Sequence, residues 1–480
     1  MKKTVVLCPG LGVGHLTPMI ALAKVFLHHG VDVTVALVEP PMKSPDFSVG
    51  VTSAAASNPA ITFDVLPPPP PPPSPPPPPA VSSSDDVRGR QIAQVFNFLK
   101  ANMKAPLRDF LLSLPSVHAL VLDIFCADAL DVAAELNLPV YFFNASGAGD
   151  LAVFLSIPTV RASMSTSFRE LGDSLLSFPG VPPIKASDLP EEAIKDSDAA
   201  KAAFRLFERV PEANGILINT FESLETRAVR ALKDGLCVPN RATPPVYCVG
   251  PLVSGGGDEE HECLRWLDAQ PDHSVVFLSF GSRGTFPKKQ LEEIATGLEN
   301  SGQRFLWVVR SPRSPDHKFG EPLPEPDLDA LLPEGYLDRT KDRGLIVKSW
   351  VPQMDVLRHR ATGAFVTHCG WNSTLEGITA GLPLLCWPLY SEQRMNKVFI
   401  VEEMKLGVEL EGYDEEVVKA DEVTAKVRLV MDSQQGRELR ERAVAAKNSA
   451  AEALEEGGMS HTAFGEFLND LLTTRSEIIG

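Results

Sequence analysis

Two residues able to exchange a proton follow apolar, strand-like runs in the first part of the chain. His15 comes shortly after the run Thr4–Cys8, and Asp123 closes the run Ala119–Asp123. The carboxyl ends of parallel strands meet at one edge of a sheet, so these two side chains can touch. A carboxylate bonded to one imidazole nitrogen stabilises the cation formed when the other nitrogen accepts a proton. The pair predicts a general base; alternatively, His15 is a polar helix-start residue and Asp123 a helix cap.

The turn that carries His15 is rich in glycine. It reads Pro9-Gly-Leu-Gly-Val-Gly-His15 and leads into a helix-period segment, residues 16–29, with Gly30 past its end. Such a turn brings backbone N–H groups and a positive helix end to the sheet edge. A dinucleotide fingerprint needs a third glycine where His15 stands, although Glu39 is placed as a ribose-binding acid would be. The mismatch counts against a dehydrogenase.

A second concentration of polar and aromatic residues runs from Trp350 to Gln393. An indole at a strand end can stack on a flat base, or pack in a core. The turn His368–Ser373 joins a strand to a helix ending at Gly381, and such a helix start suits an anion. Ser373-Thr-Leu-Glu376 also matches a capping box, which would serve only to begin a helix.

The stretch WVPQMDVLRHRATGAFVTHCGWNSTLEGITAGLPLLCWPLYSEQ, residues 350–393, closely resembles the signature box of plant family 1 UDP-glycosyltransferases of secondary metabolism. The resemblance covers essentially the whole chain except a proline insert. It implies an α/β GT-B fold, with two Rossmann-like domains facing across a cleft. It also implies donor-binding roles: uracil stacking by Trp350, base contacts from the Val351 backbone, ribose contacts by Gln353 and Glu376, phosphate contacts by Ser282, His368, Asn372 and Ser373 in a loop shaped by Trp371, and sugar contacts by Glu392, Gln393 and Ser146.

The activity that this resemblance implies is an inverting transfer of glucose from UDP-glucose to a hydroxyl of a small phenolic acceptor. His15 would remove the hydroxyl proton, with Asp123 behind it, while UDP departs from the opposite face. Gln393 together with Trp371 resembles users of glucose. The stretches 302–310 and 387–394 resemble flavonoid, chalcone and phenol O-glucosyltransferases, and we expect Phe125 and Phe142 to contact a flat acceptor.

Other functions remain open at this stage. The same fold and donor would serve another acceptor class or attack by an aromatic carbon, which gives C-glycosylation. From different classes, a nicotinamide oxidoreductase is suggested by the Rossmann-like units, and a non-catalytic UDP-sugar-binding protein by the segment Pro67–Pro79, an exposed polyproline spacer that could bind partners.

We expect neither a metal nor a cofactor, since UDP-glucose is a co-substrate. Asp196-Ser-Asp198 and Asp327-Leu-Asp329 spell D-x-D, but neither ends an apolar strand. The helix dipole and His368 are expected to offset the diphosphate charge instead.

The elements that position these residues follow a βαβ rhythm. Strands are expected at 4–8, 31–38, 119–123, 140–143 and 215–220, and in a second series at 275–280, 305–310, 345–350, 364–368 and 383–387. This pattern predicts an acceptor-binding domain at 1–245, a linker at 246–260 and a UDP-sugar-binding domain at 261–460. Apolar residues from Phe464 to Leu472 predict that a last helix, 461–480, docks back toward the first domain.

Composition and net charge limit the partners and the cellular compartment that suit this chain. The chain has 480 residues and a net charge of −17, which argues against nucleic-acid partners and polybasic membrane surfaces. Seven cysteines without a C-x-x-C pair suit a reducing compartment. No run approaches the roughly 20 apolar residues of a membrane span. These features predict a cytoplasmic protein, which we expect to be a monomer that binds only small molecules.

Overall fold

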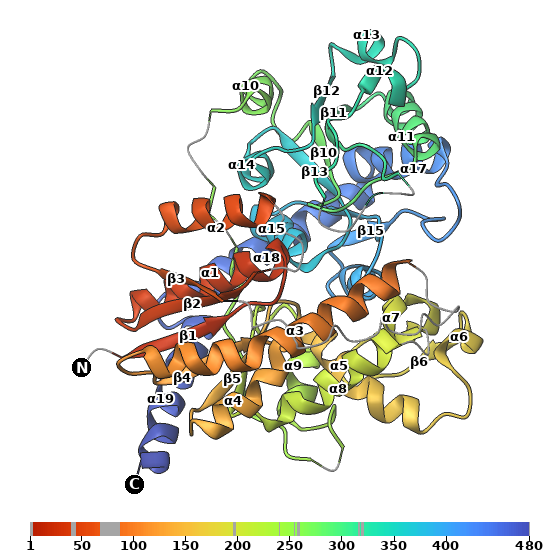
Figure 1. Cartoon of the computed structure of the whole chain (residues 1–480). Coiled ribbons are helices and arrows are strands. Elements are labelled where there is room, and N and C mark those ends of the chain that lie inside the picture. The colour runs from red at the N-terminus through yellow and green to blue at the C-terminus, as the bar shows by residue number, and fades with distance from the viewer. Residues whose placement is uncertain are drawn as a thin grey trace. The chain divides into compact units, whose positions relative to one another are not determined.

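The computed structural model describes residues 3–39, 45–67, 87–194, 198–239, 241–253, 255–256, 260–314, 317 and 321–479. The chain divides into two compact units. Unit 1 comprises Met1–Leu252 together with Leu454–Gly480, and unit 2 comprises Val253–Ala453. Each unit is an α/β assembly built on its own parallel sheet (Figure 1).

The sheet of unit 1 is parallel throughout the described residues, in the order β3-β2-β1-β4-β5-β8-β9. Its central strands are continuous apolar runs and are buried, as expected for a sheet covered on both faces. The order reverses between β1 and β4, where ligands bind in open α/β sheets. The strands are β1 (Thr4–Cys8), β2 (Asp32–Val38), β3 (Thr62–Leu66), β4 (Ala119–Asp123), β5 (Val140–Asn144), β8 (Gly215–Ile218) and β9 (Val246–Cys248).

Helices cover this sheet, and a small antiparallel pair, β6 (Leu175–Leu176) with β7 (Ile184–Lys185), lies apart from it. The last helix belongs to unit 1, because Phe464 and Phe467 pack edge-on against Phe26 of the first helix, at 5.1 and 5.7 Å between ring centroids. The helical elements are α1 (Val13–His28), α2 (Pro45–Ser57), α3 (Val87–Ser113), η1 (Ile124–Ala129), α4 (Leu130–Glu135), α5 (Ala148–Ala162), α6 (Phe168–Leu171), η2 (Ala186–Asp188), α7 (Glu191–Ile194), α8 (Asp198–Arg209), η3 (Val210–Glu212), α9 (Thr226–Lys233) and α19 (Met459–Ile479).

The first unit extends further along the chain than residue 245. Residues 246–248, placed in the linker by the sequence, form β9, because this short apolar run is buried and pairs with β8. Beyond it, the Asn219 side chain binds both backbone groups of Leu252, at 2.7 Å to its N–H and 3.2 Å to its carbonyl. Leu252 is thereby fixed as part of unit 1.

The sheet of unit 2 is also parallel, in the order β12-β11-β10-β13-β14-β15, and reverses between β10 and β13. Its strands are β10 (Val275–Ser279), β11 (Arg304–Val309), β12 (Gly344–Lys348), β13 (Thr362–Thr367), β14 (Leu384–Cys386) and β15 (Gly407–Glu409). Its helices are α10 (Glu262–Asp268), α11 (Lys288–Ser301), α12 (Leu328–Leu331), α13 (Tyr336–Thr340), α14 (Gln353–Arg358), α15 (Trp371–Ala380), α16 (Gln393–Val398), η4 (Phe399–Glu403), α17 (Ala420–Asp432) and α18 (Gln434–Leu454).

The polyproline segment lies outside the described residues apart from Pro67. Within the part of the chain that the structure describes, no helix combines the length and apolar character needed to cross a bilayer.

Candidate active site

His15 and Asp123 meet at the edge of the unit 1 sheet where the strand order reverses. The Nδ1 atom of His15 lies 2.8 Å from Oδ2 of Asp123, and Asp123 is only 2% exposed. The other carboxylate oxygen accepts the N–H of Phe125 at 2.9 Å, which caps η1. Asp123 therefore contacts His15 with one oxygen and caps η1 with the other.

The glycine-rich turn brings this pair together. α1 begins at Val13, earlier than the sequence predicts, so His15 stands in the first turn of the helix. A Cβ atom on Gly10 would lie 2.9 Å from Oδ1 of Asp123 and 3.2 Å from Cγ of His15. A side chain at position 10 would therefore displace the pair.

The aromatic residues expected near an acceptor separate into two groups. The ring of Phe125 lies 4.9 Å from that of His15 and is partly exposed. Phe142, by contrast, is fully buried in strand β5, so the structure presents only Phe125 of the two beside His15. Val13, two positions before His15, is 58% exposed, and its only signal in the sequence is an apolar residue between two glycines.

Ser146 lies in the loop that follows β5. Its hydroxyl donates a hydrogen bond to the carboxylate of Asp150. The loop is held by Asn144, whose Nδ2 donates to the carbonyls of Ser146 and Gly147. The next helix, α5, begins on the buried carboxylate of Glu225, which accepts the N–H groups of residues 148 and 149 at 2.9 and 2.8 Å.

In unit 2, Gln353 connects three side chains at the edge where the strand order reverses. Its Oε1 accepts a hydrogen bond from Ser279 at 2.7 Å, and its Nε2 lies 3.0 Å from Oγ of Ser373 and 2.6 Å from Oε2 of Glu376. Ser279, which closes β10, was not selected from the sequence. The capping-box alternative is wrong, because α15 has Gly370 as its N-cap and Ser373 lies inside the helix.

The environment of this cluster shifts two pKa values in ways that matter chemically. Burial raises the pKa of Glu376 to about 7, although the amide of Gln353 and the charge of Arg358 oppose the shift. Burial lowers the pKa of His368 to about 4. Near pH 7 this burial favours the neutral form of His368. It can contribute a hydrogen bond.

The turn at His368 is tightly packed. Cβ atoms on Gly281 and Gly370 would lie 2.6 and 2.5 Å from Nε2 of His368. The next residue, Cys369, has a φ of 64°, in the left-handed region that side chains disfavour. Ser282, on the turn after β10, is exposed, whereas Trp371, the first residue of α15, is buried.

Two residues with a left-handed backbone conformation also lie next to the ends of the signature box. Ser349 precedes Trp350 with a φ of 65°, and Ser391 precedes Glu392 with a φ of 56°. Such backbone strain persists where the surrounding structure enforces it, often at functional sites. The sequence contains no signal for it, because serine is not a typical residue at positive φ.

The residues at the two ends of the signature box differ in their exposure. Trp350 is 54% exposed, with its ring edge-on to His261 at 6.0 Å, whereas Val351 is buried. Gln393 is buried, and its Oε1 accepts the N–H groups of Leu389 and Tyr390, both at 2.9 Å. Those bonds orient the amide so that its NH₂ group is the end left to donate. Glu392 is the N-cap residue of α16.

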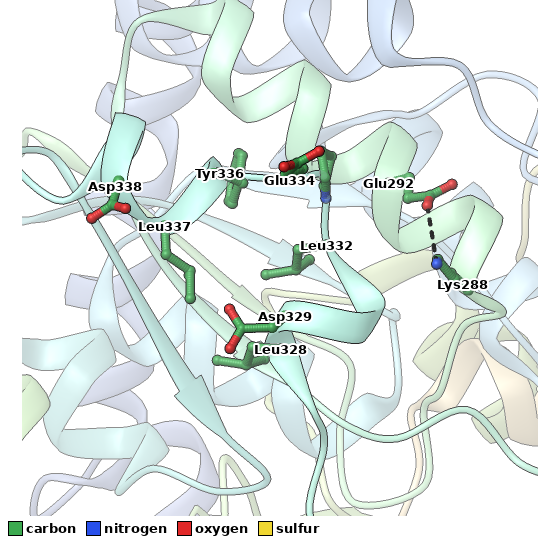
Figure 2. A pocket seen from close by; sticks show the side chains of 11 residues that line it. Lys288, Glu292, Leu328, Asp329, Leu332, Glu334, Tyr336, Leu337 and Asp338 are labelled. Carbon is green, nitrogen blue, oxygen red and sulfur yellow. Dashed lines mark ion pairs between the residues drawn. The ribbon is translucent and has the colours of Figure 1, made fainter.

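A separate pocket of about 450 Å³ lies beside α11, α12 and α13 in unit 2 (Figure 2). Leu328, Leu332 and Tyr336 supply apolar walls, and Lys288 pairs with Glu292 at 3.7 Å. None of the residues predicted to bind the donor lines this pocket, so it is distinct from the candidate site.

No three His, Cys, Asp or Glu side chains within the described ranges are arranged to hold a metal ion. Of the two D-x-D stretches, Asp327 caps α12 by accepting the N–H of Ala330 at 3.2 Å. Asp196 lies outside the described residues.

Comparison with known proteins assigns the class. The family model described as "UDP-glucoronosyl and UDP-glucosyl transferase" matches residues 233–438. An anthocyanidin 5,3-O-glucosyltransferase of a Rosa hybrid cultivar is 41% identical over 95% of this chain and 96% of its own length. A phloretin 2'-O-glucosyltransferase of Pyrus communis is 39% identical over 98% of this chain and all of its own.

A solved structure agrees with these relatives. Phytolacca americana UGT2, complexed with UDP-2-fluoro-glucose and pterostilbene, superposes with a TM-score of 0.82 at 34% identity, over 98% of this chain and 99% of that one. The chain belongs to the plant UDP-glycosyltransferases, and it is an enzyme of that family with the GT-B fold.

Proposed function

We propose that this enzyme transfers glucose from UDP-glucose to a hydroxyl of a small phenolic acceptor, with inversion at the sugar carbon. The observation that carries the proposal is the 2.8 Å contact between His15 and the buried carboxylate of Asp123. The named relatives act on anthocyanidins and phloretin, which supports a flavonoid or chalcone acceptor. The enzyme would act in the cytoplasm, as a monomer and without a metal; its seven free thiols suit a reducing compartment.

On the acceptor side, His15 acts as the general base. Its Nδ1–H donates to Asp123, which leaves Nε2 as the basic nitrogen. Nε2 takes the proton of the acceptor hydroxyl as that oxygen forms a bond to C1 of the sugar. Asp123 stabilises the resulting imidazolium, as a buried carboxylate does in other acid–base pairs. Phe125, against the His15 ring, offers an apolar surface to a flat acceptor.

On the donor side, the bond between C1 and the diphosphate oxygen breaks, and UDP leaves with that electron pair. The start of α15 and the neutral His368 supply hydrogen-bond donors to the leaving group. Gln353 and Glu376 are placed together for the ribose hydroxyls, the exposed indole of Trp350 for the uracil, and Glu392 and Gln393 for the sugar.

The test is product analysis by mass spectrometry, using phenolic acceptors with UDP-glucose, UDP-galactose and UDP-glucuronate. We expect a monoglucoside from UDP-glucose. His15→Ala should lower kcat by about 10²–10⁴-fold, the usual contribution of a general base, while calorimetry shows nearly unchanged UDP binding. Asp123→Asn, which keeps size but removes charge, should also impair kcat. Normal turnover by the His15 variant would refute the assignment.

A further inference from the structure

A buried amide on α16 reaches the turn at which α15 begins. Nδ2 of Asn396 donates a hydrogen bond to the backbone carbonyl of Cys369 at 2.9 Å, and both residues are 0% exposed. The Oδ1 atom of Asn396 has no hydrogen-bond partner among the described residues. Burying an unpaired oxygen is costly, so an apolar residue would suit this place better unless the donor were needed.

The bond restrains a backbone that would not hold its shape unaided. Cys369 has a φ of 64°, and its own N–H is held by the hydroxyl of Thr367 at 3.2 Å. Its carbonyl accepts the hydrogen bond from Asn396, a residue further along the chain. Both polar groups of this strained residue are therefore fixed by side chains, which keeps the peptide that follows in one orientation.

That peptide joins Cys369 to Gly370, the N-cap residue of α15. In a planar trans peptide the C=O and the N–H point in opposite directions. Because the carbonyl points at Asn396, the Gly370 N–H points away from α16. This N–H has no partner among the described residues, and it belongs to a helix start, where N–H groups favour an anion.

We propose that Asn396 is a positioning residue for the transfer reaction: through the Cys369 carbonyl it aims the Gly370 N–H at the diphosphate of the donor. The proposal rests on the function proposed above. Asn396 is also three residues beyond Gln393 on the same helix, so one side chain links the element proposed to hold the sugar to the turn proposed to hold the leaving group.

The neighbouring Lys397 provides a matched control. Its Nζ is 2.9 Å from Oε2 of Glu409 and 5.1 Å from the ring centroid of Tyr413, and it is buried. It therefore anchors the same helix to β15 through its ion pair with Glu409. A loss of α16 stability alone should affect the Asn396 and Lys397 variants alike.

Calorimetric titration of the full chain with UDP alone tests the proposal. Asn396→Ala should raise the Kd for UDP about tenfold, as loss of a well-placed donor does, whereas Lys397→Met should lower Tm and leave that Kd within about twofold. Equal effects of the two variants, or an unchanged Kd for Asn396→Ala, would overturn the proposal. Wild-type protein that binds no UDP would instead overturn the proposed function.

Asn396→Asp keeps the size of the side chain and makes its ability to donate a hydrogen bond depend on pH. A purely structural role of Asn396 would not give the UDP affinity this pH dependence. An ionised carboxylate offers the Cys369 carbonyl no donor, whereas a protonated one does, and burial favours the protonated form. The UDP affinity of this variant, divided by that of the wild type at each pH, should improve as the pH is lowered from 8 to 6. A ratio that does not change with pH counts against the proposal.

Discussion

Glu376 sits in an environment that opposes its ionised form. Its pKa is raised by burial to about 7 from an ordinary value of 4.5, so between these values the unfolded chain releases a proton that the folded protein retains. Stability therefore falls as the pH rises through this window, and the full cost is present above pH 7. A carboxylate kept at such a cost is consistent with binding ribose hydroxyls and not with supporting the fold.

Glu376→Gln should remove this cost, because an amide can still accept the hydrogen bond from Gln353. We expect the variant to be more stable than the wild type at pH 8 by on the order of 1–3 kcal/mol, with the two converging near pH 4.5. Urea unfolding at both pH values measures this. The variant should also bind UDP-glucose more weakly; a variant less stable at pH 8 would contradict the interpretation.

Gly10 offers a test of the His15–Asp123 pair that leaves both residues in place. Gly10→Ala puts a Cβ atom 2.9 Å from the Asp123 carboxylate, so the pair must shift. Because 1 Å misplacements can cost about 10²-fold in rate, kcat should fall by roughly that factor with little change in UDP affinity. Gly12→Ala is not a suitable control because of its φ of 108°, but Gly465→Ala, with open space around it, is.

At the scale of the element, the carboxylate of Glu225 begins a helix distant from it in the sequence. It is buried, and it accepts the first N–H groups of α5, next to the loop that carries Ser146. The positive end of a helix stabilises such an anion. The start of α5 thus depends on a residue that lies outside this helix.

Glu225→Ala should destabilise the protein by about 1.5–3 kcal/mol, the range for hydrogen bonds to a charged group, and should lower activity through the Ser146 loop. The nearby Glu222, which is about half exposed and pairs with Lys233, is the matched control; Glu222→Ala should cost less than about 1 kcal/mol. Thermal unfolding of both variants measures these losses of stability. Equal losses would show that the contact between Glu225 and α5 adds no more stability than the surface ion pair of Glu222.

The sequence predicts elements well where polar or glycine residues bound an apolar run. β1 and β4 have the expected bounds for this reason, and with them the placement of His15 and Asp123. It does not predict β9 or β15, which are only three residues long, or β3, whose side chains are mostly not buried. Pattern alone also cannot tell Phe142 from Phe125, because apolar residues at a sheet edge and in its core look alike in sequence.

The donor-binding residues likewise divide into those that the sequence predicts and those that it does not. Resemblance singles out Gln353, Ser373 and Glu376, and the structure brings them into one hydrogen-bonded cluster. The contributions of Ser279 and Asn396 depend on contacts between distant segments, and nothing in local spacing predicts them. The same holds for the pKa values, which are set by burial in the folded protein.

At the scale of the whole molecule, α19 completes a core that begins with the first strand. Phe467 is 0% exposed and contacts the rings of Phe26, Tyr141 and Tyr247. The helix therefore belongs to the hydrophobic core of unit 1 and is not an accessory to it.

Phe467→Ala should destabilise unit 1 by about 3–5 kcal/mol, the usual cost of removing a large buried aromatic side chain. Leu472→Ala, at a 37% exposed position of the same helix, should cost far less. Denaturant unfolding followed by circular dichroism measures both. UDP titration should show that the folded Phe467 variant keeps nearly normal affinity, because the uracil and diphosphate contacts are proposed in unit 2.

The division of unit 1 between two stretches of chain has a consequence for biosynthesis. Unit 2 is one continuous stretch, so it can acquire all its strands while translation is still in progress. The first unit, although its strands leave the ribosome earlier, must wait for residues beyond 454 before Phe464 and Phe467 can cover its sheet. During that interval the nascent protein exposes an apolar face, which is the period in which chaperones would be needed most.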